Sequence, residues 1–126
     1  MNPAGESPHV VVLGASPKTH RYSHQAMLLL KARGYRITPV HPRAEAVADV
    51  PVVHALADVP RPVHTVTLYV SPAHLEAQLA ELVALAPGRV IFNPGSESEL
   101  ARQRLGDAGI PWVEDCTLVM LRSGSF

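Results

Sequence analysis

Short β-branched runs alternate with longer segments of helical periodicity, and this alternation constrains the fold more than any other feature of the chain. The first run, His9–Leu13, ends at Gly14. It is apolar almost throughout, which is typical of a strand buried on both faces of a parallel sheet. Five further strands are predicted, the second of them a short edge strand: Arg36–Val40, Pro51–His54, His64–Val70, Arg89–Phe92 and Ile110–Val113.

Apolar residues at helical spacing fill most of the intervals between these runs. The predicted helices are 23–33, 44–48, 72–85, 96–107 and 117–121. Ser23 is the expected N-cap of the first helix, and Ser71 caps the third, ahead of Pro72. Ser96 and Glu99 have the spacing of a capping box.

Strands that alternate with helices predict an α/β fold, in which helices cover both faces of a parallel sheet. We expect one doubly wound domain over residues 9–126, after a disordered lead-in over residues 1–8. The favoured strand order is 3-2-1-4-5, with an extra strand. In that order His9–Leu13 lies beside His64–Val70. The chain reverses direction between these strands, and a crevice opens at their carboxyl ends.

Composition excludes several functional classes. The chain has 126 residues with 11 basic and 11 acidic side chains, so it is the size of one domain and lacks the basic surface of a nucleic-acid binder. No apolar run approaches the roughly 18 residues needed to span a bilayer, so no membrane association is expected. The N-terminus does not resemble a signal peptide, and a cytoplasmic setting is the default. A single cysteine excludes an internal disulfide.

The loop after the first strand is the main candidate for binding a phosphate. Gly14 allows a tight turn close to a ligand, and the following helix N-terminus offers free N–H groups. Ser16 and Ser23 add hydroxyls, and Lys18 and Arg21 add positive charge. The predicted cofactor-binding residues of this loop are Gly14, Ala15, Ser16, Pro17, Lys18, Arg21, Tyr22 and Ser23. The alternative is an ordinary turn with solvated basic residues.

The residues after the second strand argue against NAD. The dinucleotide fingerprint would need glycine at Ser16 and near Thr19, and an acidic residue is expected where the chain has His41-Pro42-Arg43. A neutral or positive group there suits a phosphorylated ribose, as in NADP or at the 3′-phosphate of coenzyme A (CoA). The alternative is that Arg43 is exposed and has no specific partner.

Two other segments hold residues of chemical interest. Asn93-Pro94-Gly95 follows a strand and is expected to contact the pantetheine or a substrate, although a plain turn explains it equally well. Cys116 follows Glu114 and Asp115, which disfavour a thiolate, so structural burial is favoured over a reactive thiol. The histidines lack metal-ligand spacing, so no metal is expected, and no catalytic set is assigned.

Several of these stretches together resemble the small stand-alone CoA-binding domain proteins, which are similar to the CoA-binding domain of succinyl-CoA synthetase α subunits. The matching stretches are 10–16, 21–23, 34–42, 56–60, 93–95 and 114–121. This resemblance implies a Rossmann-like fold that binds CoA across the switch point of the sheet. It does not transfer ligase activity, because the synthetase's phosphohistidine machinery lies in parts that this chain lacks.

The resemblance also implies roles for individual residues. Gly14, Ala15 and Ser16 would line the pyrophosphate, with Arg21–Ser23 nearby. His41, Pro42 and Arg43 would flank the adenosine end, and Val70, Ser71 and Pro72 would form the opposite wall. Many members of the family have asparagine in place of His41, and a Gln-x-Gly loop in place of Asn93-Pro94-Gly95.

Three functions remain open. The first is a module that binds CoA or an acyl-CoA, as a carrier, sensor or delivery protein without evident catalysis. The second is an NADP-type oxidoreductase domain, which the missing glycines and the missing substrate domain weaken. The third is a structural or regulatory protein with a vestigial site. The short, proline-rich edge of the sheet favours a homodimer, although the sequence does not establish the oligomeric state.

Overall fold

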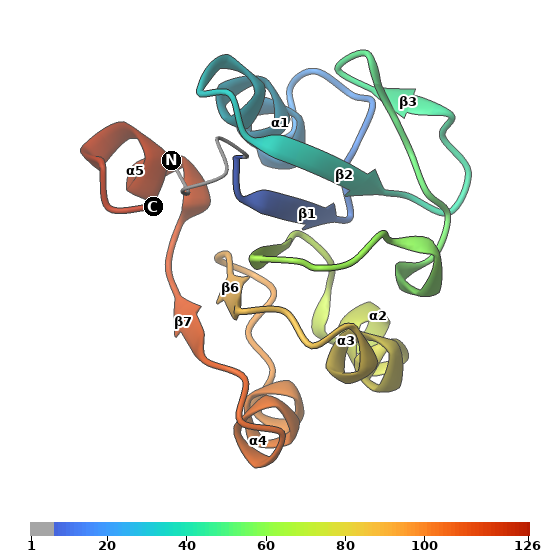
Figure 1. The fold of residues 1–126 in the computed structure, drawn as a ribbon, viewed down its shortest axis with the longest axis vertical. Coiled ribbons are helices and arrows are strands. Elements are labelled where there is room, and N and C mark those ends of the chain that lie inside the picture. Colours follow the sequence, from blue (N-terminus) through green and yellow to red (C-terminus); the bar gives the residue numbers. More distant parts are fainter. Residues whose placement is uncertain (1–6) are drawn as a thin grey trace.

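Five parallel strands form the central sheet, in the order β2-β1-β5-β6-β7 (Figure 1). The computed structural model describes residues 7–126, so most of the lead-in predicted over residues 1–8 lies outside the described residues. The strands of the sheet are β1 (His9–Leu13), β2 (Arg36–Val40), β5 (Thr65–Leu68), β6 (Arg89–Phe92) and β7 (Trp112–Glu114). The prediction that β1 lies beside β5 is confirmed.

Helices cover both faces of this sheet. On one face lie α1 (Tyr22–Ala32) and α5 (Thr117–Ser123) (Figure 1). On the other lie α2 (Pro72–Glu76), α3 (Leu79–Leu85) and α4 (Glu99–Asp107). Alternate residues of β1 supply the two cores, because successive side chains of a strand point to opposite faces. Val10 and Val12 join the core with Met27, whereas Val11 and Leu13 join the core with Leu75. The predicted doubly wound α/β architecture is confirmed.

The predicted edge strand Pro51–His54 is wrong as a strand of the main sheet. Only Val53 reaches the sheet, through an isolated bridge to Val40. The helix predicted over Ala44–Ala48 is also wrong. Instead β3 (Ala46–Val47) and β4 (Val50–Pro51) form an antiparallel hairpin. The two residues between them have φ values of 50° and 65°, which a helix does not allow. A short 3-10 helix, η1 (Leu56–Asp58), follows.

Two of the predicted helix starts are wrong. The N-cap of α1 is Arg21, and Ser23 is already helical. The N-cap of α4 is Ser98, whose Oγ accepts from the Ala101 N–H at 3.1 Å. By contrast, the Ser71 cap of α2 is confirmed, since its side chain accepts from the His74 N–H.

The helix predicted over residues 72–85 is interrupted between α2 and α3. The Gln78 side chain donates to the His74 carbonyl at 3.1 Å, and that carbonyl is the one that the Gln78 N–H would use in a continuous α-helix. The Gln78 N–H bonds instead to the Leu75 carbonyl at 2.9 Å. The break therefore follows from a side chain that competes with the backbone. Among the described residues, no helix is long and apolar enough to span a membrane.

Candidate functional site

The loops after β1 and β5 meet at the carboxyl edge of the sheet, where the winding direction changes. The Tyr69 N–H donates to the Leu13 carbonyl at 2.8 Å, so the end of β5 is tied to the end of β1. The Val40 carbonyl accepts from the N–H groups of Gly14 and Ala15, at 3.1 and 3.2 Å, which ties the β1 loop to the end of β2. Three strand ends therefore converge at the predicted crevice, the usual ligand position in open α/β sheets.

Gly14 is required by packing as well as by backbone conformation. Its φ is +88°, and a Cβ at this position would lie 2.7 Å from the Tyr69 carbonyl oxygen. A Cβ atom essentially never lies so close to a backbone oxygen, so a side chain at this position would push the two loops apart. The glycine therefore allows the close approach of the two loops, whatever ligand they bind.

Hydrogen bonds around Ser16 define the shape of the β1–α1 loop. Its N–H donates to Ser23 Oγ at 3.1 Å, and its own Oγ accepts from the Lys18 N–H at 3.1 Å. His24 Nδ1 donates to the Ser16 carbonyl at 2.9 Å. Each serine hydroxyl is an acceptor in these bonds and keeps its hydrogen. Both can therefore still donate to an anion.

The sequence predicted free N–H groups at the helix start, and among residues 7–126 they lie in the first turn of α1. The N–H groups of Gly14, Ala15 and Ser16 are already bonded within the protein. At the start of α1, by contrast, the N–H groups of Tyr22, Ser23 and His24 have no partner among residues 7–126.

The charge around this helix start is positive. The first turn of α1 contains no acidic residue, and the exposed side chains of Lys18 and Arg21 make no ion pair with any described residue. Pro17 is exposed in the same loop, and Tyr22 is 73% exposed. Unbonded N–H groups and unpaired cations thus coincide at one helix start, an arrangement that suits a phosphate group.

At the end of β2, His41 organises the loop that follows. Its Nδ1 accepts from the N–H groups of Arg43 and Ala44, at 3.0 and 2.9 Å. The carboxamide oxygen of an asparagine would make the same bonds in an Asx-turn, so His41 can substitute locally for asparagine. Pro42 and Arg43 are exposed, and the Arg43 guanidinium has no partner among the described residues.

Asn93, at the end of β6, is a structural connector. Its Nδ2 donates to Thr67 Oγ1 at 2.6 Å and to the Leu68 carbonyl at 2.8 Å, and its Oδ1 accepts from the Thr117 N–H at 2.9 Å. Both amide hydrogens are therefore used inside the protein. The side chain joins β5, β6 and α5, whereas Pro94 and Gly95 are exposed and remain accessible for the expected contact with a ligand.

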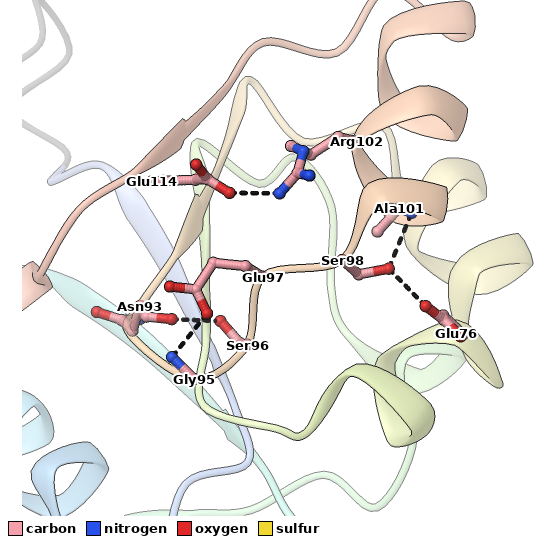
Figure 2. Close-up of polar contacts among 9 residues, drawn as sticks. All are labelled: Glu76, Asn93, Gly95, Ser96, Glu97, Ser98, Ala101, Arg102 and Glu114. Carbon is pink, nitrogen blue, oxygen red and sulfur yellow. Dashed lines mark hydrogen bonds and ion pairs between the residues drawn. The ribbon is translucent and has the colours of Figure 1, made fainter.

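The rest of the β6–α4 loop is held by its own polar groups (Figure 2). Ser96 Oγ donates to the Asn93 carbonyl at 2.7 Å, and the Gly95 N–H donates to Glu97 Oε1 at 2.8 Å. Ser98 Oγ, the cap of α4, also donates to Glu76 Oε2 at 2.7 Å. Ser96 is thus used within the loop, which explains why the capping box predicted at this serine does not form.

A buried group of hydroxyls beneath this edge was not predicted from the sequence. Thr67 Oγ1 and Thr117 Oγ1 lie 2.7 Å apart. The Tyr69 hydroxyl is buried without a hydrogen-bond partner among the described residues. Burial raises the pKa of Tyr69 to about 12, so the phenol is neutral at physiological pH. Thr117 is 50 residues from Thr67 in the sequence, and each residue is ordinary in its own segment, so no local pattern predicted the group.

Cys116 and the rest of the described surface give weaker evidence of a binding site than the carboxyl edge of the sheet does. Cys116 is only partly buried, at the N-cap position of α5, and its N–H donates to Asp115 Oδ1 at 2.7 Å. Within residues 7–126, no three His, Cys, Asp or Glu side chains gather as a metal site. A hollow of about 170 Å³ lies between η1 and α3, and none of the predicted site residues lines it.

Solved structures of similar proteins support the fold. An uncharacterised protein is 37% identical and superposes with a TM-score of 0.90, over 97% of this chain and 100% of its own. A protein from Thermus thermophilus is 31% identical, with a TM-score of 0.86, over 95% of this chain and 91% of its own.

A larger enzyme contains a domain of the same fold. The dinucleotide-forming acetyl-coenzyme A synthetase 1 of Ca. Korarchaeum cryptofilum is 15% identical, with a TM-score of 0.74. The match covers 86% of this chain and 25% of the enzyme, and at this identity it shows the fold alone.

No curated protein matches the chain significantly. The family model described as "CoA binding domain" matches residues 8–122, which include all of the candidate site and every strand of the sheet. The chain therefore belongs to the CoA-binding domain family.

Proposed function

We propose that this protein binds CoA at the carboxyl edge of the sheet, with the pyrophosphate at the start of α1. The observation that carries the proposal is that, among residues 7–126, the N–H groups of Tyr22, Ser23 and His24 have no partner and the nearby cations Lys18 and Arg21 make no ion pair. The ordered Ser16–Ser23 contact holds these donors in place. A preorganised set of donors lowers the entropic cost of binding an anion.

The loop after β2 is assigned to the adenosine end. His41 orders this loop, and the Arg43 guanidinium, which has no partner in the described part of the chain, suits the 3′-phosphate of CoA. Val70, Ser71 and Pro72, after β5, form the opposite wall. Gly14 and Ala15 allow close approach, Pro17 lies at the rim, and Pro94 and Gly95 extend the edge toward the pantetheine.

We infer a role in carrying, sensing or delivering CoA or an acyl-CoA. Polar side chains beneath the edge favour this role over a reaction, because Asn93, Thr67 and Thr117 bond to one another. The Tyr69 phenol, with its pKa raised to about 12 by burial, is a poor general base near neutral pH.

Calorimetric titration with four ligands tests the proposal. We expect CoA to bind, dephospho-CoA to bind more weakly, and NAD and NADP not to bind. The Arg43→Ala variant should reduce the preference for CoA over dephospho-CoA, because the 3′-phosphate would lose its ion pair. Binding of NADP without binding of CoA would overturn the proposal in favour of an oxidoreductase domain.

A further inference from the structure

The two edges of the sheet differ. At the β2 edge, the Val53 N–H donates to the Pro39 carbonyl and the His41 N–H donates to the Val53 carbonyl, so the edge is partly covered. The Val40 carbonyl bonds to the Gly14 N–H, so the backbone groups of Val40 point toward β1 and those of Pro39 point away from the sheet. Proline fits at position 39 because no backbone N–H is needed on that side of the strand. The β7 edge has no such cover among the described residues.

The unpaired groups of β7 are identified by its bonds to β6. The Pro111 carbonyl accepts from the Val90 N–H at 2.9 Å, and the Asp115 N–H donates to the Phe92 carbonyl at 3.1 Å. The backbone N–H and C=O groups of successive residues in a strand point alternately to its two sides. Those of Trp112 and Glu114 therefore point away from β6 and from the sheet. None of these groups has a partner among residues 7–126. Unpaired edge groups are a template for another strand.

The side chains of this edge are unusually apolar for an exposed strand. Trp112 is 37% exposed and Val113 is 41% exposed. The Trp112 ring packs against the Phe92 ring, with centroids 5.8 Å apart, and therefore lies on the α4 face of the sheet. Val113, its neighbour, points to the opposite face. Apolar surface is thus exposed on both faces of one free edge.

We propose that β7 pairs antiparallel with β7 of a second copy of this chain, which extends the two sheets into one. The two-fold axis passes beside Val113, so that Val113 faces its own copy. Trp112 then faces Glu114 of the second copy, and the outward N–H and C=O groups of both residues are satisfied. The proposal does not depend on CoA binding.

Charge complementarity favours a second copy as the occupant. Within one chain, Arg102 pairs with Glu114, and its guanidinium lies 5.7 Å from the centroid of the Trp112 ring (Figure 2 shows the ion pair). In the antiparallel pair, Glu114 of the second copy lies opposite Trp112 and therefore next to Arg102. The interface then holds two arginines and two glutamates in alternation. Opposite charges across neighbouring strands stabilise the pairing.

Sedimentation equilibrium over a micromolar to millimolar range tests the proposal with the full chain. We expect the wild-type chain to form dimers and Val113→Lys to raise the dimer dissociation constant about tenfold or more, because two lysines would face each other. Leu28→Lys is the matched control, because Leu28 is exposed on α1 and its substitution should leave the constant unchanged. A monomeric wild-type chain, or equal dimerisation of Val113→Lys, would overturn the proposal.

A second pair of variants tests the backbone contact. Glu114→Pro removes an outward N–H and keeps every bond from β7 to β6, whereas Glu114→Gln keeps that N–H and removes the charge. We expect Glu114→Pro to weaken the dimer more than Glu114→Gln does, with circular dichroism verifying that both variants are folded. Equal dissociation constants for the two variants would show that the edge backbone is not in the interface.

Discussion

Gly14 shows how one residue can determine whether the candidate site forms. Two costs apply to any side chain there: a positive φ and a contact with the Tyr69 carbonyl. Gly95 has a φ of +96°, and a Cβ added to it would have no atom within 4 Å, so it carries the first cost alone. Comparing substitutions of Gly14 and Gly95 therefore separates the cost of backbone strain from the cost of steric overlap.

We expect Gly95→Ala to lower the free energy of unfolding by about 1 kcal/mol, the usual cost of a left-handed residue. Gly14→Ala should cost about 3 kcal/mol or more, because the β1 and β5 loops must also separate. Urea denaturation of both variants measures the difference. Equal costs would mean that the Gly14 loop moves aside freely.

His9 makes the stability of the fold depend on pH. It is 5% exposed, its Nδ1 donates to the Pro62 carbonyl at 3.0 Å, and Nε2 therefore accepts from the Thr38 hydroxyl at 2.6 Å. Burial is the main reason that the pKa of His9 lies below its ordinary value of 6.5, and the charge of Arg36 adds to the effect. The native state thus favours neutral His9.

A lowered pKa in the folded state means that the unfolded state binds the proton more readily. The contribution of His9 to stability is therefore complete above pH 6.5 and is lost as the pH falls toward its folded-state pKa. We expect the free energy of unfolding to fall between pH 7.5 and pH 5, and to fall less in His9→Gln. Urea denaturation at both pH values checks this, and an identical decrease in the two proteins would exclude His9 as a source.

The elements of the sheet were easier to predict than the starts of its helices. β1 and β6 match the predicted ranges, because continuous apolar runs can be buried only as central strands. The start of α4 was misplaced by a few residues because Ser96 and Ser98 are both good caps. The choice depends on the Asn93 carbonyl, which binds Ser96 Oγ. The spacing of residues in the sequence does not show which of the two serines is bound elsewhere and which is free to cap the helix.

Asn93 links three elements, so its loss should affect stability before it affects binding. We expect Asn93→Ala to lower the free energy of unfolding by about 2–4 kcal/mol, because the Leu68 carbonyl and the Thr117 N–H would be buried without partners. Asn93→Asp keeps the acceptor for the Thr117 N–H and loses the donors. It should still destabilise the fold, because a carboxylate would face the Leu68 carbonyl. Thermal denaturation compares both variants with wild type, and an unchanged melting temperature for Asn93→Ala would contradict the connecting role.

For the whole molecule, topology made the general position of the site predictable. Parallel strands with right-handed crossovers bring the loops after β1, β2, β5 and β6 to one edge. Free N–H groups at the helix start were predictable, but the internal use of the N–H groups nearer β1 was not. The Val40 carbonyl and Ser23 Oγ occupy the N–H groups of Gly14 and Ser16, through contacts that sequence spacing does not specify. We therefore place the proposed phosphate site at the first turn of α1 rather than at the N–H groups of Gly14 and Ser16.

The chain has 11 basic and 11 acidic residues, so attraction to a polyanion must come from local rather than net charge. We expect Lys18→Ala to weaken CoA binding about three- to tenfold and to reduce its salt dependence. Arg104→Ala is the control, because Arg104 is exposed on α4, far from α1 in the fold (Figure 1). Calorimetry at low and high salt measures both effects. Equal losses in the two variants would indicate nonspecific attraction.

Titration of the ¹⁵N-labelled protein with CoA reports directly whether CoA binds at the first turn of α1. We predict that the amide signals of Tyr22, Ser23 and His24 shift most, because their N–H groups would donate to the pyrophosphate, and that Arg43 shifts with them. Unchanged signals at these residues, with the shifts confined to the hollow between η1 and α3, would exclude binding of CoA at this helix start.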